Sequence, residues 1–351
     1  MKFFNLDCHI SVIEDIKTVF TDLGHTVDSW SLSGHNWVLN RQATKVDIVN
    51  EHTWTNLNQQ MCDSFYERYK NDLSNYDAFI CGHPPCFSLL YKKFNKPIIS
   101  QCTIRYEVPF SNDKNKWNMF NDYLRESIDQ NKLFVSANSL YDKKYFEFFV
   151  NRSCTHIPSL CEYTKTDWAP EYNKFLYSGR LPINFNNDFV INKNSLGKYE
   201  WRDLTKFLGI IIIPYNCSLM SIFEHYTANI PLFFPSKNFM MELYKNYKQY
   251  VLSELTWNQV YNLSEGSVID CDQSNDPNKF NDFEIMSKWI DYSDFYNQEW
   301  FPHITYFDSF DDLQSKLNSV DLKEINNKLK IQNAIKKEKV YNLWNDKLNN
   351  I

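Results

Sequence analysis

The sequence predicts an α/β protein with two tandem domains, each built on a parallel sheet. Segments with the pattern of strands and helices alternate along most of the chain, and a helix that crosses between two strands joins parallel neighbours. The 351 residues suffice for two domains of ordinary size, each able to bury its own core. Hydrophobic residues make up 43% of the chain and charged residues 23%, which is the composition of a globular protein.

The first strand-helix-strand unit occupies residues 2–33. Residues 2–7 (KFFNLD) have the pattern of a short buried strand, and residues 26–33 (TVDSWSLS) alternate as a second strand. Between them, residues 11–25 repeat apolar side chains at helical spacing, and Gly24 ends this helix. The crossover predicts that the two strands are parallel.

The same alternation continues to residue 160. We expect strands at residues 77–83, 96–102, 132–138 and 155–160, and helices at residues 61–76, 84–95, 117–130 and 139–150. Two prolines at its start favour the helix at 84–95, because proline fits the first turn of a helix.

A polar segment that contains a proline, residues 161–173, interrupts the pattern. We place the domain boundary at about residue 170, so the predicted domains are residues 1–170 and residues 171–351. The second domain repeats the alternation, with strands at residues 174–182, 210–216 and 230–236 and helices at residues 201–209, 218–229, 238–251 and 308–318. The last helical stretch, residues 321–350, is expected to cross back and brace the first domain.

Composition disfavours several classes of protein. No apolar run is long enough to span a bilayer, and the N-terminal residues lack the basic and long apolar regions of a secretory signal. The nine cysteines are scattered without a CxxC pair, so we expect a cytoplasmic protein with neither a disulfide framework nor a zinc site. The net charge of −6 argues against broad nucleic-acid binding.

Several cofactor motifs are missing. With only 7 glycines, the chain contains neither GxGxxG nor GxxxxGK[ST], which disfavours a standard dinucleotide fold and a P-loop enzyme. It has no HExxH and no DxD flanked by apolar strands, so we expect no metal and no other cofactor. Aromatic residues reach 17%, and they either fill the core or line a groove for sugar rings.

The second domain offers a candidate binding site at the carboxyl ends of its strands, where parallel sheets bind ligands. The start of the helix after the strand at 210–216 presents unpaired backbone N–H groups, with the hydroxyls of Ser218 and Ser221 beside them, and suits a diphosphate. Arg180 adds a bidentate positive charge, and Glu224, about one turn further along the helix, can accept hydrogen bonds from ribose hydroxyls. The structural alternatives are a surface salt bridge for Arg180, an exposed or ion-paired helix residue for Glu224, and a simple helix cap for Ser218.

The loop after the first strand holds Asp7, Cys8 and His9. A histidine at this place can take a proton from an acceptor hydroxyl, and Asp7 is a candidate to orient it. His35 and His83 follow other strands of the same domain and compete with His9 for this role. A purely structural histidine is the alternative for all three.

Two segments of the second domain resemble the GT-B class of glycosyltransferases. The segment FLYSGRLP looks like the strand and Gly-Arg that open their donor domain, and it carries Gly179 and Arg180. The segment GIIIIPYNCSLMSIFEHYTANIPLFFPS looks like their donor-binding run, and it places Ser218, Ser221 and Glu224 on the phosphate and ribose positions. The ending YFDSFDDLQSKL also resembles their late strand, acidic turn and helix.

This resemblance implies two Rossmann-like domains that face a central cleft. The implied donor is a nucleotide-sugar bound by the second domain, and the implied acceptor, a glycan or a small hydroxyl compound, binds the first. The chain departs from the pattern in three places: no Lys-Gly follows the Gly-Arg motif, Asn229 replaces a glycine, and no glycine-rich loop follows the first strand. Retaining and inverting chemistry both stay open.

Two functions follow from these residues. The first is a metal-independent hexosyl- or pentosyltransferase in which Arg180 and the helix start stabilise the leaving diphosphate. The second is a non-catalytic two-domain protein that binds a carbohydrate or a partner, which the missing lysine favours. Transfer of a sugar to DNA bases is a narrower variant of the first, and the acidic net charge disfavours it.

Overall fold

The structure, a computed structural model, describes residues 1–183, 185 and 189–351. The chain forms two compact units. Unit 1 comprises Met1–Ser159, Gly266–Asp276 and Tyr341–Ile351, and unit 2 comprises Leu160–Glu265 and Pro277–Val340. Each unit contains one parallel sheet with helices, so the predicted α/β fold with two sheet-based domains is confirmed.

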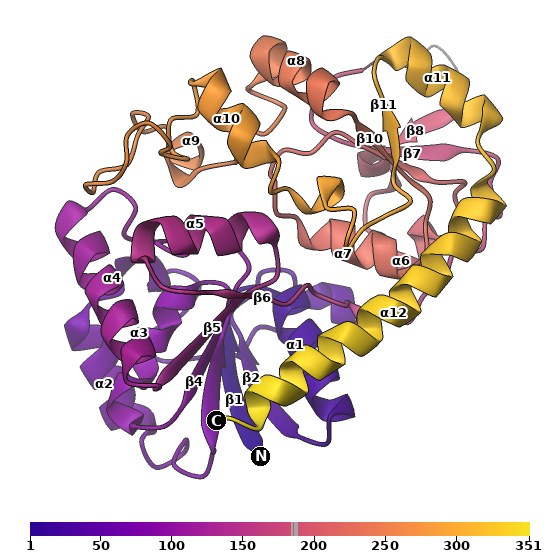
Figure 1. Ribbon diagram of the computed structural model, residues 1–351. Coiled ribbons are helices and arrows are strands. Elements are labelled where there is room, and N and C mark those ends of the chain that lie inside the picture. The colour runs from indigo at the N-terminus through magenta and orange to yellow at the C-terminus, as the bar shows by residue number, and fades with distance from the viewer. Residues whose placement is uncertain (184, 186–188) are drawn as a thin grey trace. The chain divides into compact units, whose positions relative to one another are not determined.

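The sheet of unit 1 has six parallel strands in the order β2-β1-β3-β4-β5-β6 (Figure 1). These strands are β1 (Lys2–Asp7), β2 (Thr26–Ser31), β3 (Ala78–Cys81), β4 (Ile98–Cys102), β5 (Leu133–Ala137) and β6 (Thr155–His156). In the register, Phe3 pairs with Val27 on one side and with Ala78 on the other. Strand β1 therefore lies inside the sheet, and its residues Phe3, Phe4 and Leu6 are fully buried.

The longer helices of unit 1 are α1 (Ile10–Asp22), α2 (Gln59–Tyr69), α4 (Lys114–Asp129) and α5 (Leu140–Val150). Side chains cap three of them: Asn58, Asp113 and Ser139 each accept a hydrogen bond from a backbone N–H of the first turn. Short 3-10 turns lie at Asn36–Leu39 (η1) and Trp54–Asn56 (η2).

The single helix predicted at residues 84–95 is instead three short turns. These are η3 (Pro85–Phe87), α3 (Ser88–Tyr91) and η4 (Lys92–Phe94). Asn95 has a left-handed backbone with φ of 52°, which ends the segment. The prolines do begin a helical stretch, as predicted, but it does not stay α-helical.

Aromatic side chains fill the core of unit 1. The Phe79 and Tyr91 rings stack at 4.4 Å between centroids, and Phe4 packs edge-on against Tyr91 at 6.3 Å. Burying each such ring contributes about 1.5–3 kcal/mol to folding. The largest fully buried side chains of the described residues are all aromatic, so much of the aromatic content of the chain serves packing.

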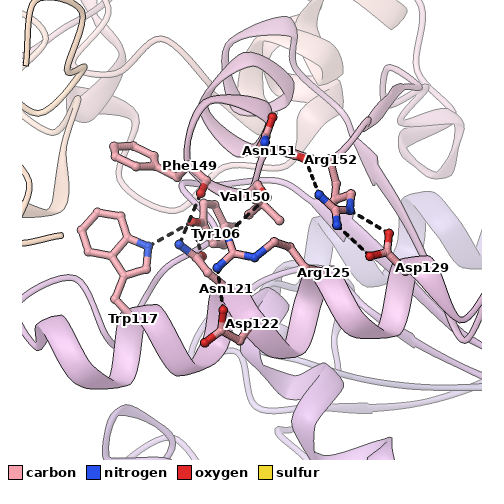
Figure 2. Close-up of polar contacts among 10 residues, drawn as sticks. All are labelled: Tyr106, Trp117, Asn121, Asp122, Arg125, Asp129, Phe149, Val150, Asn151 and Arg152. Atoms are coloured by element: carbon pink, nitrogen blue, oxygen red, sulfur yellow. Dashed lines mark hydrogen bonds and ion pairs between the residues drawn. The ribbon is translucent and has the colours of Figure 1, made fainter. Parts of the chain in front are cut away.

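A chain of hydrogen bonds ties α4 to the end of α5, as Figure 2 shows. The Trp117 Nε1 donates to the Tyr106 hydroxyl at 3.0 Å, and that hydroxyl donates to the Asn121 Oδ1 at 2.5 Å. The Asn121 amide then donates to the Phe149 carbonyl at 3.4 Å. Because Trp117, Tyr106 and Asn121 are buried, each polar atom needs such a partner, and the chain fixes the two helices against each other.

The sheet of unit 2 has five parallel strands in the order β11-β10-β9-β7-β8. They are β7 (Phe175–Ser178), β8 (Val190–Asn192), β9 (Ile210–Ile212), β10 (Leu232–Pro235) and β11 (Thr305–Phe307). Strand β9 is a run of buried isoleucines, which is typical of a central parallel strand with both faces covered. Strand β8 was not predicted.

Short helices and turns connect the strands of unit 2. They are η5 (Glu162–Thr164), η6 (Lys193–Leu196), α6 (Trp201–Leu204), α7 (Met220–Thr227), α8 (Lys237–Tyr247), α9 (Trp257–Val260), α10 (Phe283–Ile290), η7 (Asp294–Tyr296) and α11 (Phe310–Ser319). Helix α6 is much shorter than the predicted helix at 201–209, and α9 and α10 were not predicted.

The final helix, α12 (Leu322–Leu348), belongs to unit 2 up to Val340 and to unit 1 from Tyr341. In unit 1, the buried Trp344 ring packs against Phe20 of α1 at 5.1 Å and against Phe134 of β5 at 6.3 Å. The Tyr341 hydroxyl donates to the Asp22 Oδ2 at 2.6 Å. The predicted return of the last helix to the first sheet is confirmed.

Among the described residues, no helix has the length and apolar character needed to cross a membrane.

Candidate functional site

Each sheet has one topological switch point, where successive connections leave in opposite directions. In unit 1, β1 lies between β2 and β3, so the switch point is at the carboxyl ends of β1 and β3. In unit 2, β7 lies between β8 and β9, so the switch point is at the carboxyl ends of β7 and β9. Ligands of parallel α/β sheets bind at such points.

Asp7, the last residue of β1, joins the two loops at the switch point of unit 1. Its carboxylate is fully buried. The Oδ2 atom accepts hydrogen bonds from the backbone N–H groups of Gly82 and His83, both at 2.8 Å. The Oδ1 atom accepts one from the backbone N–H of His9 at 3.0 Å. Asp7 thus holds the backbone of the His9 and His83 loops.

The position of Asp7 changes its acidity. Burial raises the pKa of Asp7 to about 7, and the hydrogen bonds from His83, His9 and Gly82 oppose this rise. The carboxylate contacts the backbone of His9, whereas the Nδ1 of the His9 ring is buried and has no hydrogen-bond partner among the described residues. Asp7 therefore positions the His9 loop through its main chain.

His9 and His83 lie side by side at this switch point. Their ring centroids are 5.3 Å apart. Burial lowers the pKa of His9 to about 4, with a further contribution from His35. Burial also lowers the pKa of His83 to about 3, helped by His9 and Arg105. Both imidazoles are consequently neutral at pH 7.

Two small residues shape the same loops. A Cβ placed on Gly82 would lie 2.7 Å from the Val12 Cγ1 and 3.1 Å from the Asp7 Oδ2, so only glycine allows this close approach. The Thr103 hydroxyl, just after β4, lies 3.4 Å from the Nδ1 of His83. His35 is exposed in the loop after β2, where its backbone N–H donates to the Ser33 hydroxyl at 3.1 Å.

Arg180 marks the switch point of unit 2. It follows β7, and its guanidinium lies 4.1 Å from the ring centroid of Tyr215, which follows β9. Its Nη1 atom lies 2.5 Å from the Glu254 Oε1 and 3.3 Å from the Ser253 hydroxyl. Burial raises the pKa of Tyr215, and the nearby Glu254 adds to the rise. An arginine stacked on an aromatic ring with one carboxylate partner can present its remaining N–H groups to a phosphate.

Gly179 has a structural reason to be glycine. A Cβ at this position would lie 2.5 Å from the hydroxyl of Tyr177. That hydroxyl donates to the carbonyl of Leu181 at 2.7 Å and closes the turn after β7. The close approach of Tyr177 thus fixes the turn that carries Arg180.

Ser218 and Ser221 flank the start of α7. The capping position is Leu219, which makes no side-chain cap, and the backbone N–H of Ser218 donates to the Asn216 Oδ1 at 3.3 Å. Ser221 lies in the first turn, and both serines are partly exposed. Neither hydroxyl caps the helix, so the start of α7 keeps the partial positive charge of a helix N-terminus.

Glu224 is buried within α7, with 9% of its surface exposed. Its Oε1 accepts a hydrogen bond from the Tyr163 hydroxyl at 2.5 Å. The Tyr163 ring in turn packs edge-on against Trp201 at 5.4 Å. Glu224 is therefore bonded to η5, whose Tyr163 ring packs against α6.

Sequence reasoning did not find several residues of these two sites. Thr103 and Tyr215 also follow strands, so the strand-end rule could have found them. Tyr163 and Glu254 come from segments without a strand or helix pattern, and no local signal marked them. Among the described residues, no group of three or more His, Cys, Asp or Glu side chains is arranged to hold a metal ion.

Comparisons with known proteins give structural neighbours only. No protein-family model and no curated protein matches this chain. Among solved structures, a kitacinnamycin glycosyltransferase is 9% identical with a TM-score of 0.45 and covers 98% of each chain. The calicheamicin glycosyltransferase CalG4 is 10% identical with a TM-score of 0.42 and covers 100% of this chain and 98% of its own.

A third neighbour is the lipopolysaccharide outer core galactosyltransferase WaaB in its apo form. It is 11% identical with a TM-score of 0.39 and covers 67% of this chain and 80% of its own. All three neighbours are glycosyltransferases, the class that the sequence motifs resemble.

Proposed function

We propose that this protein is a GT-B type glycosyltransferase that moves a hexose or pentose from a nucleotide-sugar to a hydroxyl acceptor. The observation that carries the proposal is the set of polar groups at the switch point of unit 2. A stacked arginine, an uncapped helix start and a buried glutamate follow adjacent strands there. These are the groups that a diphosphate and a ribose need.

The donor nucleotide binds unit 2. Its diphosphate contacts Arg180 and the start of α7, with the hydroxyls of Ser218 and Ser221 as further donors. Glu224 accepts hydrogen bonds from the ribose hydroxyls, in competition with the Tyr163 hydroxyl that it binds in this structure. Gly179 serves the turn and leaves room for the phosphate beside Arg180.

The acceptor binds unit 1, where His9 is the base and Asp7 holds its loop. As the acceptor oxygen bonds to the anomeric carbon of the sugar, the bond from that carbon to the diphosphate breaks, and the diphosphate keeps the electron pair. The acceptor proton passes to the neutral imidazole of His9. Burial lowers the pKa of His9 to about 4, so its ring is in the unprotonated form that a base requires at pH 7.

The transfer requires no metal ion in this proposal. Arg180 and the helix start supply the positive charge that stabilises the leaving diphosphate. The direct check is activity in the presence of EDTA, which is expected to stay unchanged.

A thermal-shift panel tests the proposal first. The full chain is heated with UDP, GDP, ADP, CMP and TDP and with their common sugar conjugates, each with magnesium and with EDTA. A ligand that binds only the folded state raises its stability, so we expect one nucleotide to raise the Tm equally with and without metal. Absence of a shift in folded protein would favour the non-catalytic carbohydrate- or partner-binding alternative.

Donor hydrolysis separates the enzyme from a binding module. A transferase is expected to release nucleoside diphosphate slowly from its donor even without acceptor, whereas a binding module releases none. A gel shift with duplex DNA tests the DNA-base variant, and we expect no shift because the net charge is −6.

A further inference from the structure

A cavity of about 510 Å³ lies in unit 1, and its lining residues differ from those described at the switch point of that unit. It is formed by the segment before α2, by α2 itself, by α3 and η4, and by α4 with the loop that precedes it. Its volume falls in the range of roughly 300–1,000 Å³ that is usual for small-molecule sites. We call it the lysine-rimmed pocket.

The walls of the lysine-rimmed pocket are mostly apolar. Leu57, Leu89, Phe110 and Met119 line it. Met119 has 53% of its surface exposed, which is high for a large hydrophobic residue. Cys62 adds a buried thiol, and burial raises the pKa of this thiol to about 12, so it stays protonated and acts as part of the apolar wall.

The charged residues that line the pocket all have the same sign. Lys92, Lys93 and Lys116 line it, and no described Asp or Glu does. The Nζ of Lys93 is 2.9 Å from the Asp63 carboxylate, and the Nζ of Lys116 is 3.6 Å from that of Asp113. Lys92 has no carboxylate partner among the described residues, and its Nζ lies 5.5 Å from the Tyr123 ring centroid.

We propose that the lysine-rimmed pocket binds an amphipathic monocarboxylate whose apolar body fills the cavity and whose carboxylate pairs with Lys92. The apolar walls favour a hydrocarbon body over a sugar or a nucleotide. One negative charge suffices, because carboxylates of the chain already neutralise the other two lysines. The pocket shares no lining residue with the proposed transfer site, so this binding is independent of the glycosyltransferase proposal.

Calorimetric titration of the full chain, without any nucleotide-sugar, tests the pocket. The probes are dodecanoate below its micelle concentration, 2-naphthoate, dodecanol and dodecyltrimethylammonium. We expect dodecanoate to bind with one site per chain, dodecanol at least tenfold more weakly, and the cation not at all. The comparison of dodecanoate with 2-naphthoate shows whether the preferred body is aliphatic or aromatic.

Two variants place the binding in this pocket. Lys92→Met keeps the length of the side chain and removes the charge. It should therefore weaken the binding of dodecanoate about tenfold and leave the binding of dodecanol unchanged. Leu89→Trp fills the cavity and should abolish binding of both. The exposed Lys45 of unit 1 supplies the matched control, and Lys45→Met should bind dodecanoate like the wild type.

Three results would overturn the proposal. They are equal affinity for dodecanoate and dodecanol, unchanged dodecanoate affinity in Lys92→Met, and no dodecanoate binding by folded wild-type protein. If no nucleotide raises the Tm in the thermal-shift panel, these three measurements still test the pocket, since none of them uses a nucleotide.

Discussion

The Oδ2 of Asp7 accepts a hydrogen bond from the backbone N–H of His83 across 2.8 Å, although the two residues are 76 positions apart in the chain. This contact joins the loop after β1 to the loop after β3. The carboxylate also accepts hydrogen bonds from the backbone N–H groups of Gly82 and His9. One side chain therefore sets the geometry of both histidine loops.

Asp7→Asn should destabilise the protein. The amide has one acceptor oxygen and turns an NH₂ group toward backbone donors, so at least one buried N–H loses its partner. We expect a loss of about 1–3 kcal/mol in the free energy of unfolding, measured by urea denaturation at pH 8. The exposed Asp72 provides the control, and Asp72→Asn should change stability by less than about 0.5 kcal/mol. Equal losses in the two variants would contradict the role of Asp7.

His83 should make the stability of the protein fall in mild acid. Its pKa is about 3 in the folded state and about 6.5 in the unfolded chain, so only the unfolded chain takes up a proton as the pH falls from 6.5 toward 3. Stability from this group is therefore complete above pH 6.5 and is lost below it, by up to about 2 kcal/mol at pH 5. Urea denaturation at pH 7 and pH 5 should show a smaller fall for His83→Asn than for the wild type. The exposed His52 serves as control, and His52→Asn should follow the wild type.

His9→Ala should lower turnover with little change in donor affinity. A base that acts in the transition state contributes about 10²–10⁴-fold to kcat, while the proposed donor site lies in unit 2. Steady-state kinetics with the donor found in the thermal-shift panel measures both quantities. Parallel measurement of His83→Ala decides which imidazole accepts the proton, because the larger loss of kcat identifies it. Normal turnover in both variants would remove the histidines from the mechanism.

Arg180→Gln should weaken the binding of a nucleoside diphosphate and leave the binding of the nucleoside unchanged. The guanidinium is the only part of the proposed donor site that pairs with phosphate as a full charge, so its loss should cost about tenfold or more in diphosphate affinity. Calorimetry with the diphosphate and with its nucleoside measures the difference. Arg202→Gln, an exposed arginine of α6, should leave both affinities unchanged. Equal weakening of diphosphate and nucleoside would place Arg180 away from the phosphates.

Glu224→Gln should reduce the Tm increase that the donor nucleotide produces, because a neutral amide is a weaker acceptor for ribose hydroxyls. The substitution should reduce the Tm increase less for the 2′-deoxynucleotide than for the ribonucleotide, since the deoxynucleotide lacks one of the hydroxyls. Glu242→Gln on the exposed face of α8 is the control and should keep the full Tm increase. If ribose and deoxyribose nucleotides respond alike in all three proteins, Glu224 does not bind the sugar.

Local patterns predicted the elements that alternate regularly. Residues 2–33 carry clear strand and helix periodicities, and β1, α1 and β2 form there. Residues 84–95 were predicted as one α-helix, but only Ser88–Tyr91 is α-helical; 3-10 turns lie on both sides of it, and the left-handed Asn95 ends the segment. Helix α10 was not predicted, although it has a buried apolar face that includes Ile285 and Trp289.

The strand-end rule predicted the placement of His9 and Arg180, because both directly follow strands. It could not predict what they contact. Glu254 reaches Arg180 from the segment between α8 and α9, and Tyr163 reaches Glu224 from an irregular turn. Such pairings depend on how distant segments meet, which no local pattern records. The sequence likewise carried no sign that Asp7 binds the main chain of His9 and leaves its ring alone.

Helix α12 sets an order of events during synthesis on the ribosome. Unit 1 begins at Met1, yet its Phe20 and Phe134 are covered by Trp344 from the segment 341–351. Domains usually fold as they emerge, the N-terminal one first. Here the nascent first sheet keeps an uncovered aromatic patch while the whole of unit 2 is being translated. Unit 1 is complete only when the last turns of α12 arrive, so a ribosome stalled before residue 341 holds a first unit whose Phe20 and Phe134 lack the cover of Trp344.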